Sequence, residues 1–220
     1  MKLIDSTLYH RAVPPQDARG ALHPTLLLLH GRGADEEDLF GLSSDLDKRF
    51  MIITVRAPYP FPYSGGFTWY DVDEVGTPES TMFKSSYEKL STFVGDMITQ
   101  YPVDRKQLYV LGFSMGTVMS YAMALTQPSL FRGVVANSGY IAEKTHLTYG
   151  WDRLGSIEFF VAHGTGDPVI PVQFARRARG LLETAHARFD YKEYPMGHEI
   201  SAESLQDFSL WLTNRLDAPV

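Results

Sequence analysis

The feature that most constrains this chain is the alternation of short, wholly apolar runs with longer amphipathic stretches. Strands that are buried on both faces, as in a parallel sheet, show continuous apolar runs and no polar alternation. Five runs of this kind predict central strands, at residues 25–29, 51–55, 108–111, 133–136 and 157–161. We also expect a last strand at residues 189–194 and an antiparallel strand near the N-terminus, around residues 3–9.

Helices are predicted between these strands, because apolar residues recur there at intervals of three and four and so form one apolar face each. Pro171 and Ser201 are typical residues at the start of the last two helices. Strands that alternate with helices predict an α/β fold with a mostly parallel central sheet flanked by helices. The chain has no internal repeat or linker-like segment, so one domain over residues 1–220 is expected. The helical patterns lie around residues 39–46, 87–98, 118–125, 174–182 and 205–212.

Composition excludes several classes of function. The net charge is -6 and the acidic residues are spread along the chain, so no basic stripe is available to bind nucleic acid. The absence of cysteine removes disulfides, thiolate nucleophiles and cysteine-based metal sites. No apolar stretch approaches the roughly 20 residues that a bilayer span needs, and no signal peptide is evident. We therefore expect a cytoplasmic protein without stable membrane insertion, as a monomer or a homodimer.

The predicted site lies beyond the carboxyl ends of the strands, where ligands bind in open α/β sheets. The run at residues 108–111 leads into the segment GFSMG at 112–116, which matches the pattern G-x-S-x-G. In this pattern a serine occupies a sharp strand-to-helix turn with a strained backbone, which exposes its hydroxyl above the sheet. Ser114 is therefore the predicted nucleophile. The alternative is a helix N-cap in a glycine turn.

A serine hydroxyl needs a base to take its proton, and the base needs an acid to hold it in the right tautomer. In folds with this turn, the order along the chain is serine, acid, histidine. Asp167 follows the strand at 157–161, and His198 follows the strand at 189–194. Both are expected at the same edge of the sheet as Ser114. Asp167 precedes a proline and also suits an Asx turn, a role compatible with orienting His198.

Acyl transfer also needs backbone N–H donors for the oxygen that becomes negatively charged. One donor is expected from Met115, the residue after the nucleophile, and the other from the loop that follows the first parallel strand. That loop reads HGRG at residues 30–33, and Arg32 is the predicted second donor. The two glycines allow the backbone to approach a ligand closely, although a tight turn would need them as well.

With these residues, the chain resembles the phospholipase/carboxylesterase family, small α/β-hydrolases without a cap domain that include the acyl-protein thioesterases. The resemblance implies a catalytic triad of Ser114, Asp167 and His198, main-chain oxyanion donors at Arg32 and Met115, and ester or thioester substrates, with no cofactor and no metal. It covers nearly the whole chain. The segments that carry it are LHGRGAD at 29–35, AP at 57–58, WYD at 69–71, GFSMG at 112–116, SG at 138–139, HGTGD at 163–167 and GH at 197–198.

The function expected from these observations is a serine carboxylesterase that hydrolyses short to medium acyl esters, with a lysophospholipid or a thioester as further substrates. The alternative is a binding protein of the same fold that has lost catalysis. Such proteins usually lack a triad member, whereas this chain has all three in order. A peptidase of this fold would carry a large gating domain, and a dienelactone-type hydrolase would have cysteine in place of Ser114.

Residues 56–84 form a long connection that is rich in aromatic residues, and long connections in compact domains are usually functional. Aromatic walls suit an apolar acyl group and exclude water. Phe61, Tyr63 and Phe67 are the predicted contacts of a small-molecule ester substrate. Trp69 and Tyr70 are expected to anchor the connection in the core.

Arg32 departs from the resemblance, because thioesterase members of the family usually carry an apolar residue at this place. Two interpretations remain open. Arg32 could form a surface ion pair with an acid of the run at residues 36–38, or it could stand at the mouth of the site and favour acidic substrates.

Overall fold

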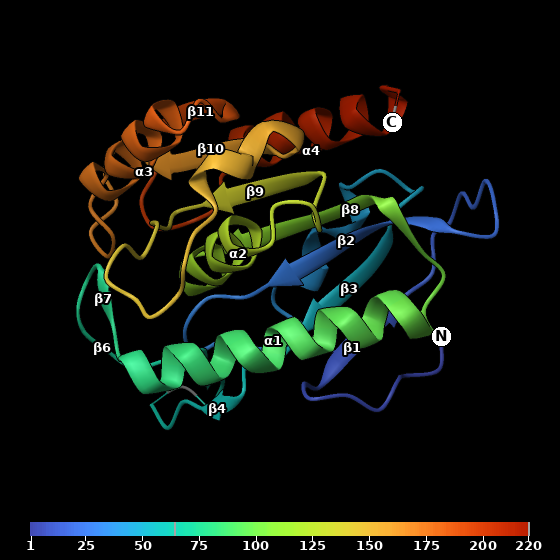
Figure 1. Cartoon of the computed structure of the whole chain (residues 1–220), viewed down its shortest axis with the longest axis horizontal. Helices are drawn as coiled ribbons and strands as arrows, with labels where there is room; N and C mark the ends of the chain where they lie inside the picture. The colour runs from blue at the N-terminus through green and yellow to red at the C-terminus, as the bar shows by residue number, and fades with distance from the viewer. Residues whose placement is uncertain (64, 220) are drawn as a thin grey trace.

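The computed structural model describes residues 1–63 and 65–219, and for Asp73 the backbone alone. Within these residues, seven strands form one twisted sheet in the order β1-β3-β2-β8-β9-β10-β11 (Figure 1). Neighbouring strands are parallel except β1, which runs antiparallel to β3. The mostly parallel α/β-hydrolase sheet predicted from the sequence is therefore confirmed. Its strands are β1 His10–Val13, β2 His23–Leu29, β3 Met51–Val55, β8 Val103–Phe113, β9 Gly133–Asn137, β10 Glu158–Gly164 and β11 Arg188–Tyr194.

The N-terminal strand differs from its predicted position. We expected it around residues 3–9, whereas β1 spans His10–Val13. The earlier residues lie along helix α1 (Ser80–Gln100) instead, where Ser6 Oγ donates to Asp96 and Thr7 Oγ1 donates to the carbonyl of Lys89. Because Ser6 and Thr7 form hydrogen bonds with this helix, their segment lies outside the sheet.

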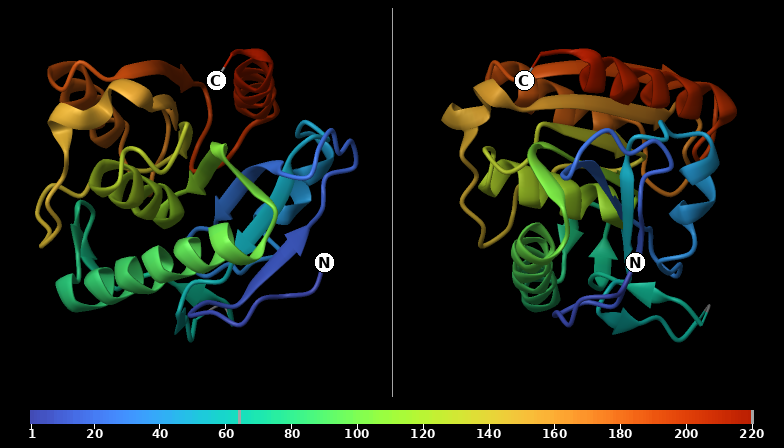
Figure 2. Two further views of the ribbon diagram at one scale, coloured as in Figure 1. Left: turned by 45° about the vertical axis from the view of Figure 1, so that its right-hand side comes forward. Right: turned by 90° about the vertical axis from the view of Figure 1, so that its right-hand side faces the viewer.

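The helices cover both faces of the sheet (Figure 2). Apolar residues of α1 Ser80–Gln100, α2 Met115–Thr126 and α3 Gln173–Thr184 pack on one face. The 3₁₀ helix η1 Leu39–Ser44 and α4 Ala202–Asp217 pack on the other face. A second 3₁₀ helix, η2 Trp151–Ser156, precedes β10. In the described part of the chain, no helix combines the length and apolarity required to cross a bilayer.

Two helix starts can be compared with the sequence signals. Ser201 caps α4 as predicted, since its Oγ accepts a hydrogen bond from the N–H of Ser204 at 3.2 Å. Pro171 lies two residues before the first residue of α3, and its carbonyl accepts from the N–H of Phe174 at 2.9 Å. The helix predicted around residues 39–46 is the short η1, which ends at Ser44. A glycine and consecutive serines disfavour a longer α-helix there.

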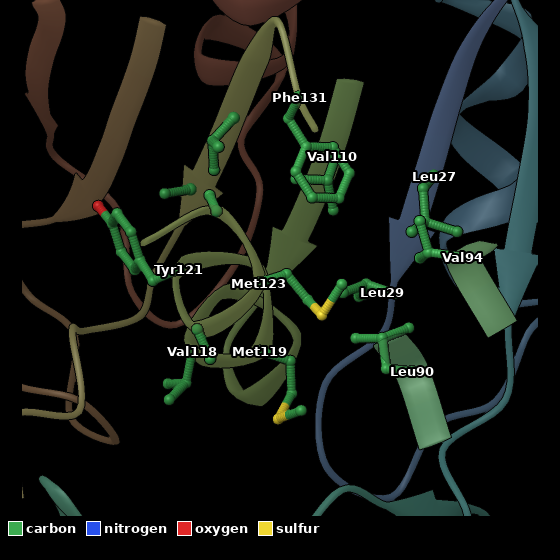
Figure 3. Packing of buried hydrophobic residues seen from close by; sticks show 14 of the residues in the cluster. Leu27, Leu29, Leu90, Val94, Val110, Val118, Met119, Tyr121, Met123 and Phe131 are labelled. Carbon is green, nitrogen blue, oxygen red and sulfur yellow. The ribbon is translucent and has the colours of Figure 1, made fainter. Parts of the chain in front are cut away.

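The core lies between β2, β8 and the helices α1 and α2 (Figure 3). Leu27 and Leu29 of β2 and Val110 of β8 are fully buried against Leu90 of α1 and Met119 of α2. Alternate residues of the same strands are buried on the opposite face with α4 and η1. Burial on both faces explains why these strands read as continuous apolar runs. The central strand β8 is consequently a rigid support for the turn that follows it.

The long connection between β3 and α1 contains two short hairpins. β4 Tyr59–Pro60 pairs with β5 Phe67–Thr68, and β6 Val72–Glu74 pairs with β7 Thr77–Pro78. Trp69 and Tyr70, between the hairpins, are fully buried as predicted. The indole N–H of Trp69 donates to the carbonyl of His30 at 2.9 Å. This bond joins the connection to the loop that follows β2.

Candidate active site

Ser114 occupies the sharp turn between β8 and α2. Its φ of 56° and ψ of -118° are unfavourable for a residue with a Cβ, so the surrounding structure must hold the backbone in place. The N–H of Ser114 donates to the carbonyl of Asn137 at 3.0 Å. The hydroxyl of Thr117 lies 2.8 Å from the carbonyl of Gly112 and 2.6 Å from that of Asn137. The turn predicted from the sequence pattern is thus fastened to both β8 and β9.

The glycines around the turn are required by close backbone approach. A Cβ on Gly116 would lie 1.9 Å from the carbonyl oxygen of Leu29 in β2, and one on Gly112 would lie 2.4 Å from the backbone of Gly116. Real Cβ contacts do not come this close. A Cβ on Gly31 would lie 3.3 Å from the Cβ of Ser114. Glycine at these positions therefore lets the two loops meet beside the serine hydroxyl.

The structure brings Ser114, His198 and Asp167 together in one hydrogen-bonded chain. Nε2 of His198 lies 2.9 Å from Oγ of Ser114, and Nδ1 lies 2.7 Å from Oδ2 of Asp167. A carboxylate only accepts hydrogen bonds, so Nδ1 carries the proton and Nε2 is free to accept one from the serine. The Asp167 side chain is fully buried, whereas that of His198 is 16% exposed.

The loop after β10 holds the Asp167 carboxylate in a fixed orientation. Its Oδ1 accepts from the N–H groups of Val169 and Ile170, each at 2.8 Å, which makes the Asx turn expected before Pro168. Nε2 of His163 lies 2.8 Å from the carbonyl of Ile170 and supports the same loop. Burial lowers the pKa of His163, so its ring is neutral and Nε2 donates to this carbonyl. This supporting role of His163 is not predicted by the sequence.

The two candidate oxyanion donors belong to the two segments that meet beside the nucleophile. Met115 is the first residue of α2, where backbone N–H groups lack an acceptor within the helix. Arg32 lies in the loop after β2, and no hydrogen bond of its N–H occurs among the described residues. His30 supports this loop, since its Nε2 accepts from the N–H of Ala57 at 3.0 Å and its Nδ1 then donates to the carbonyl of Gly31 at 2.7 Å. Burial lowers the pKa of His30 and keeps this ring neutral.

Comparison with known proteins places this chain in a family. The family model described as Phospholipase/Carboxylesterase matches residues 13–215. The chain belongs to this family. Acyl-protein thioesterase 1 of Candida albicans is 25% identical over 210 residues, which cover 86% of this chain and 90% of that protein.

Solved structures show the same fold as this phospholipase/carboxylesterase family member. The Bacillus cereus carboxylesterase has a TM-score of 0.82 and 21% identity, with 94% of each chain covered. The carboxylesterase from Mesorhizobium loti has a TM-score of 0.84 and 20% identity, with 96% of this chain and 97% of that chain covered. The three alignments cover 86–96% of this chain, so the family fold accounts for almost all of it.

A small cavity opens beside Ser114 in this family member. Its volume is about 120 Å³, and its walls are mostly apolar. A second cavity of about 350 Å³ shares Val75 and Tyr140 with it. In the described part of the chain, Arg32 is the one charged residue that lines the smaller cavity. Its lining consists of Arg32, Tyr70, Val72, Val75, Ser114, Met115, Tyr140, Val169 and Ile170.

The aromatic residues predicted to contact substrate do not line either cavity. Tyr63 is 87% exposed and packs edge-on against Phe61 at a ring distance of 5.3 Å. Phe67 lies under the guanidinium of Arg56, 4.5 Å from ring centroid to carbon. The β4–β5 hairpin folds back on residues 33 and 34, and the rings of Phe61 and Phe67 lie against the side chains of Arg32 and Arg56. Val72 and Val75, from the following hairpin, line the smaller cavity, where we expected these rings.

We expect the free energy of unfolding to depend on pH, because three histidines are buried. Burial lowers the pKa of His10, His30 and His163 in the folded state below the ordinary value of 6.5. The unfolded chain therefore binds more protons below pH 6.5, and the free energy of unfolding falls as the pH drops through this region. The slope is up to about 1.4 kcal/mol per pH unit for each histidine.

Urea unfolding at pH 7.5 and pH 5.5 measures this slope. His163→Asn should make it shallower, because one of the three titrating rings is removed. A free energy of unfolding that is equal at the two pH values would contradict the prediction.

Proposed function

We propose that the protein is a serine carboxylesterase that hydrolyses short to medium acyl esters through an acyl-enzyme on Ser114. The observation that carries the proposal is the position of His198, whose two ring nitrogens lie within hydrogen-bond distance of Ser114 and Asp167. This geometry lets His198 act as a general base toward the serine hydroxyl, while Asp167 holds the imidazole and stabilises its positive charge.

The reaction proceeds in two halves. Ser114 Oγ attacks the ester carbonyl carbon as its proton passes to Nε2 of His198. The carbonyl oxygen becomes negative and is stabilised by the N–H groups of Met115 and Arg32. His198 then returns the proton to the leaving alcohol, and the acyl group remains on Ser114. A water molecule, deprotonated by His198, then attacks the acyl-enzyme, and His198 returns this proton to Ser114 Oγ as the bond between the serine and the acyl group breaks and the carboxylic acid leaves.

The cavity beside Ser114 supports a preference for short acyl groups. Sites for drug-sized ligands usually measure about 300–1,000 Å³, and this cavity is smaller than that. The apolar valines and Ile170 on its walls suit hydrocarbon and exclude water from the acyl carbon. A longer chain, such as that of a lysophospholipid, would have to extend past Val75 toward the neighbouring cavity. A thioester could use the same nucleophile and donors, since only the leaving group changes.

A fluorophosphonate probe tests this proposal. We expect stoichiometric labelling of the wild-type protein, because the probe reacts with an activated serine, and no labelling of Ser114→Ala. Hydrolysis of butyrate esters should be equal before and after treatment with EDTA. Ser138→Ala is a suitable control, since Ser138 is also a buried serine with positive φ but lies outside the hydrogen-bonded chain. Labelling of Ser114→Ala, or activity that returns only with a divalent ion, would count against the serine mechanism.

A further inference from the structure

Arg32 brings to the cavity beside Ser114 a positive charge that has only a weak ion-pair partner among the described residues. Among the described side chains, the one acid that pairs with its guanidinium is Asp71, at a nitrogen–oxygen distance of 4.0 Å, and the two side chains are 40% and 63% exposed. Among the described residues, the Arg32 guanidinium makes no hydrogen bond. An exposed ion pair at this distance contributes little free energy of stabilisation. The charge therefore remains available to a ligand.

The acidic run that follows Arg32 does not neutralise it. Glu36 is bound by Arg56, whose Nε lies 2.6 Å from the carboxylate, and Glu37 is bound by Arg11. No ion pair joins Arg32 to this run in the described residues. The first interpretation of Arg32 from the sequence, a surface pair with residues 36–38, is therefore not what the structure shows.

The guanidinium of Arg32 packs on an aromatic ring. Phe61 lies beneath it, with 4.6 Å between the guanidinium carbon and the ring centroid. This contact gives Phe61 a different role from the predicted acyl contact, because it supports the arginine that lines the cavity. The backbone of Arg32 belongs to the loop that borders Ser114. A side chain held in this way loses less conformational freedom when it binds an anion.

The remaining walls of the cavity increase the effect of this charge. Valines and Ile170 surround the opening and reduce access of water, so a charge–charge contact is screened less than on the open surface. Burial raises the pKa of Tyr70 far above its usual value, so this neighbour is neutral. Glu74 lines the adjacent cavity, and Asp71 is the acid that competes for Arg32.

We propose that the Arg32 side chain makes the protein selective for short esters that carry a carboxylate a few bonds from the scissile carbonyl. The inference rests on the proposed esterase function and names its substrate class. A guanidinium binds a carboxylate through charge-assisted hydrogen bonds. The small cavity restricts the class to compact molecules, such as half-esters of short dicarboxylic acids.

Two matched pairs of esters test the proposal and locate the carboxylate. Monoethyl succinate carries the charge on the acyl side, and its neutral counterpart of similar shape is ethyl 4-methylpentanoate. Carboxymethyl butyrate carries the charge on the alcohol side, and its neutral counterpart is isobutyl butyrate. The measured quantity is the ratio of kcat/KM for the charged ester to kcat/KM for its counterpart.

In at least one pair, we expect Arg32→Gln to lower this ratio about 10-fold, which is the low end for a charged hydrogen bond because the side chain is partly exposed. Arg32→Lys keeps the charge and should retain most of the ratio. Asp71→Asn should raise it, since a competing acid is removed. Arg11→Gln is the matched control, because it removes the same charge from an exposed pair outside the cavity lining and should leave the ratio unchanged.

An equal ratio in wild type and Arg32→Gln for both pairs would overturn the proposal, as would an equal loss in Arg11→Gln. A different result is expected if the protein is not a serine esterase at all. In that case neither neutral ester is hydrolysed and the fluorophosphonate probe does not label Ser114.

Discussion

Ser114→Ala is expected to lower kcat for ester hydrolysis by about 10⁴- to 10⁶-fold while the protein remains folded. The substitution removes the attacking oxygen and adds no atom to the turn, which is held by the N–H of residue 114 and by Thr117. Activity that remains should come from the oxyanion donors and from substrate binding. Steady-state kinetics with a butyrate ester measures the loss, and circular dichroism with thermal unfolding measures whether the fold is retained.

His198→Ala should produce a loss of similar size, because Ser114 and His198 act in the same proton transfer. The double substitution should therefore be hardly worse than either single one. Losses that multiply in the double variant would show that the two residues act independently. Asp167→Asn should also lose activity, since an amide in place of Oδ2 can favour the wrong tautomer of His198.

Gly116→Ala is expected to destabilise the protein by at least about 3 kcal/mol, the upper end for overpacking in a core. The added methyl would lie 1.9 Å from the carbonyl oxygen of Leu29, and the nearest atoms around it are all backbone atoms of Leu29 and His30. The methyl group and the Leu29 carbonyl can move apart only if α2 or β2 is displaced. Urea unfolding measures the change in the free energy of unfolding, and a severe case would appear as insoluble protein.

Gly180→Ala is the matched control for this substitution. Gly180 lies within α3, and a Cβ there would have no atom within 4 Å. Alanine should stabilise the helix by about 0.5–1 kcal/mol because the unfolded chain loses conformational freedom. Equal stability of the two variants would mean that the turn after β8 adapts to a side chain, contrary to the close packing described above.

The sequence was most informative where burial on both faces or close backbone approach restricts the residue type. The central strands were recognisable because residues 51–55 and 108–111 are apolar without interruption. The turn at Ser114 was recognisable because a short pattern must satisfy strand, turn and helix together. The order of Ser114, Asp167 and His198 then placed all three at one edge of the sheet, where the structure has them.

Prediction was poorer where a residue type suits several environments. Aromatic side chains stack on guanidinium groups as readily as they form a pocket, so the composition of residues 56–84 did not distinguish a wall from a support. Phe61 lies on Arg32 for this reason. Two of the valines that line the cavity, Val72 and Val75, belong to a hairpin whose strands have three and two residues, which is too short for a periodic pattern. The predicted position of the N-terminal strand was wrong because pairing with β3, about 40 residues further along the chain, determines which residues join the sheet.

The strand order has a consequence for the way in which this protein loses activity. Ser114 follows β8 in the middle of the sheet, whereas His198 follows β11, which is the outermost strand and has most of its residues partly or fully exposed. Outer strands open more readily than central ones, because fewer buried contacts hold them. The base can thus separate from the nucleophile while the interior of the sheet is still intact. We therefore expect inactivation under mild heat or denaturant to begin as a local, reversible opening of one edge of the sheet, before cooperative unfolding of the whole molecule.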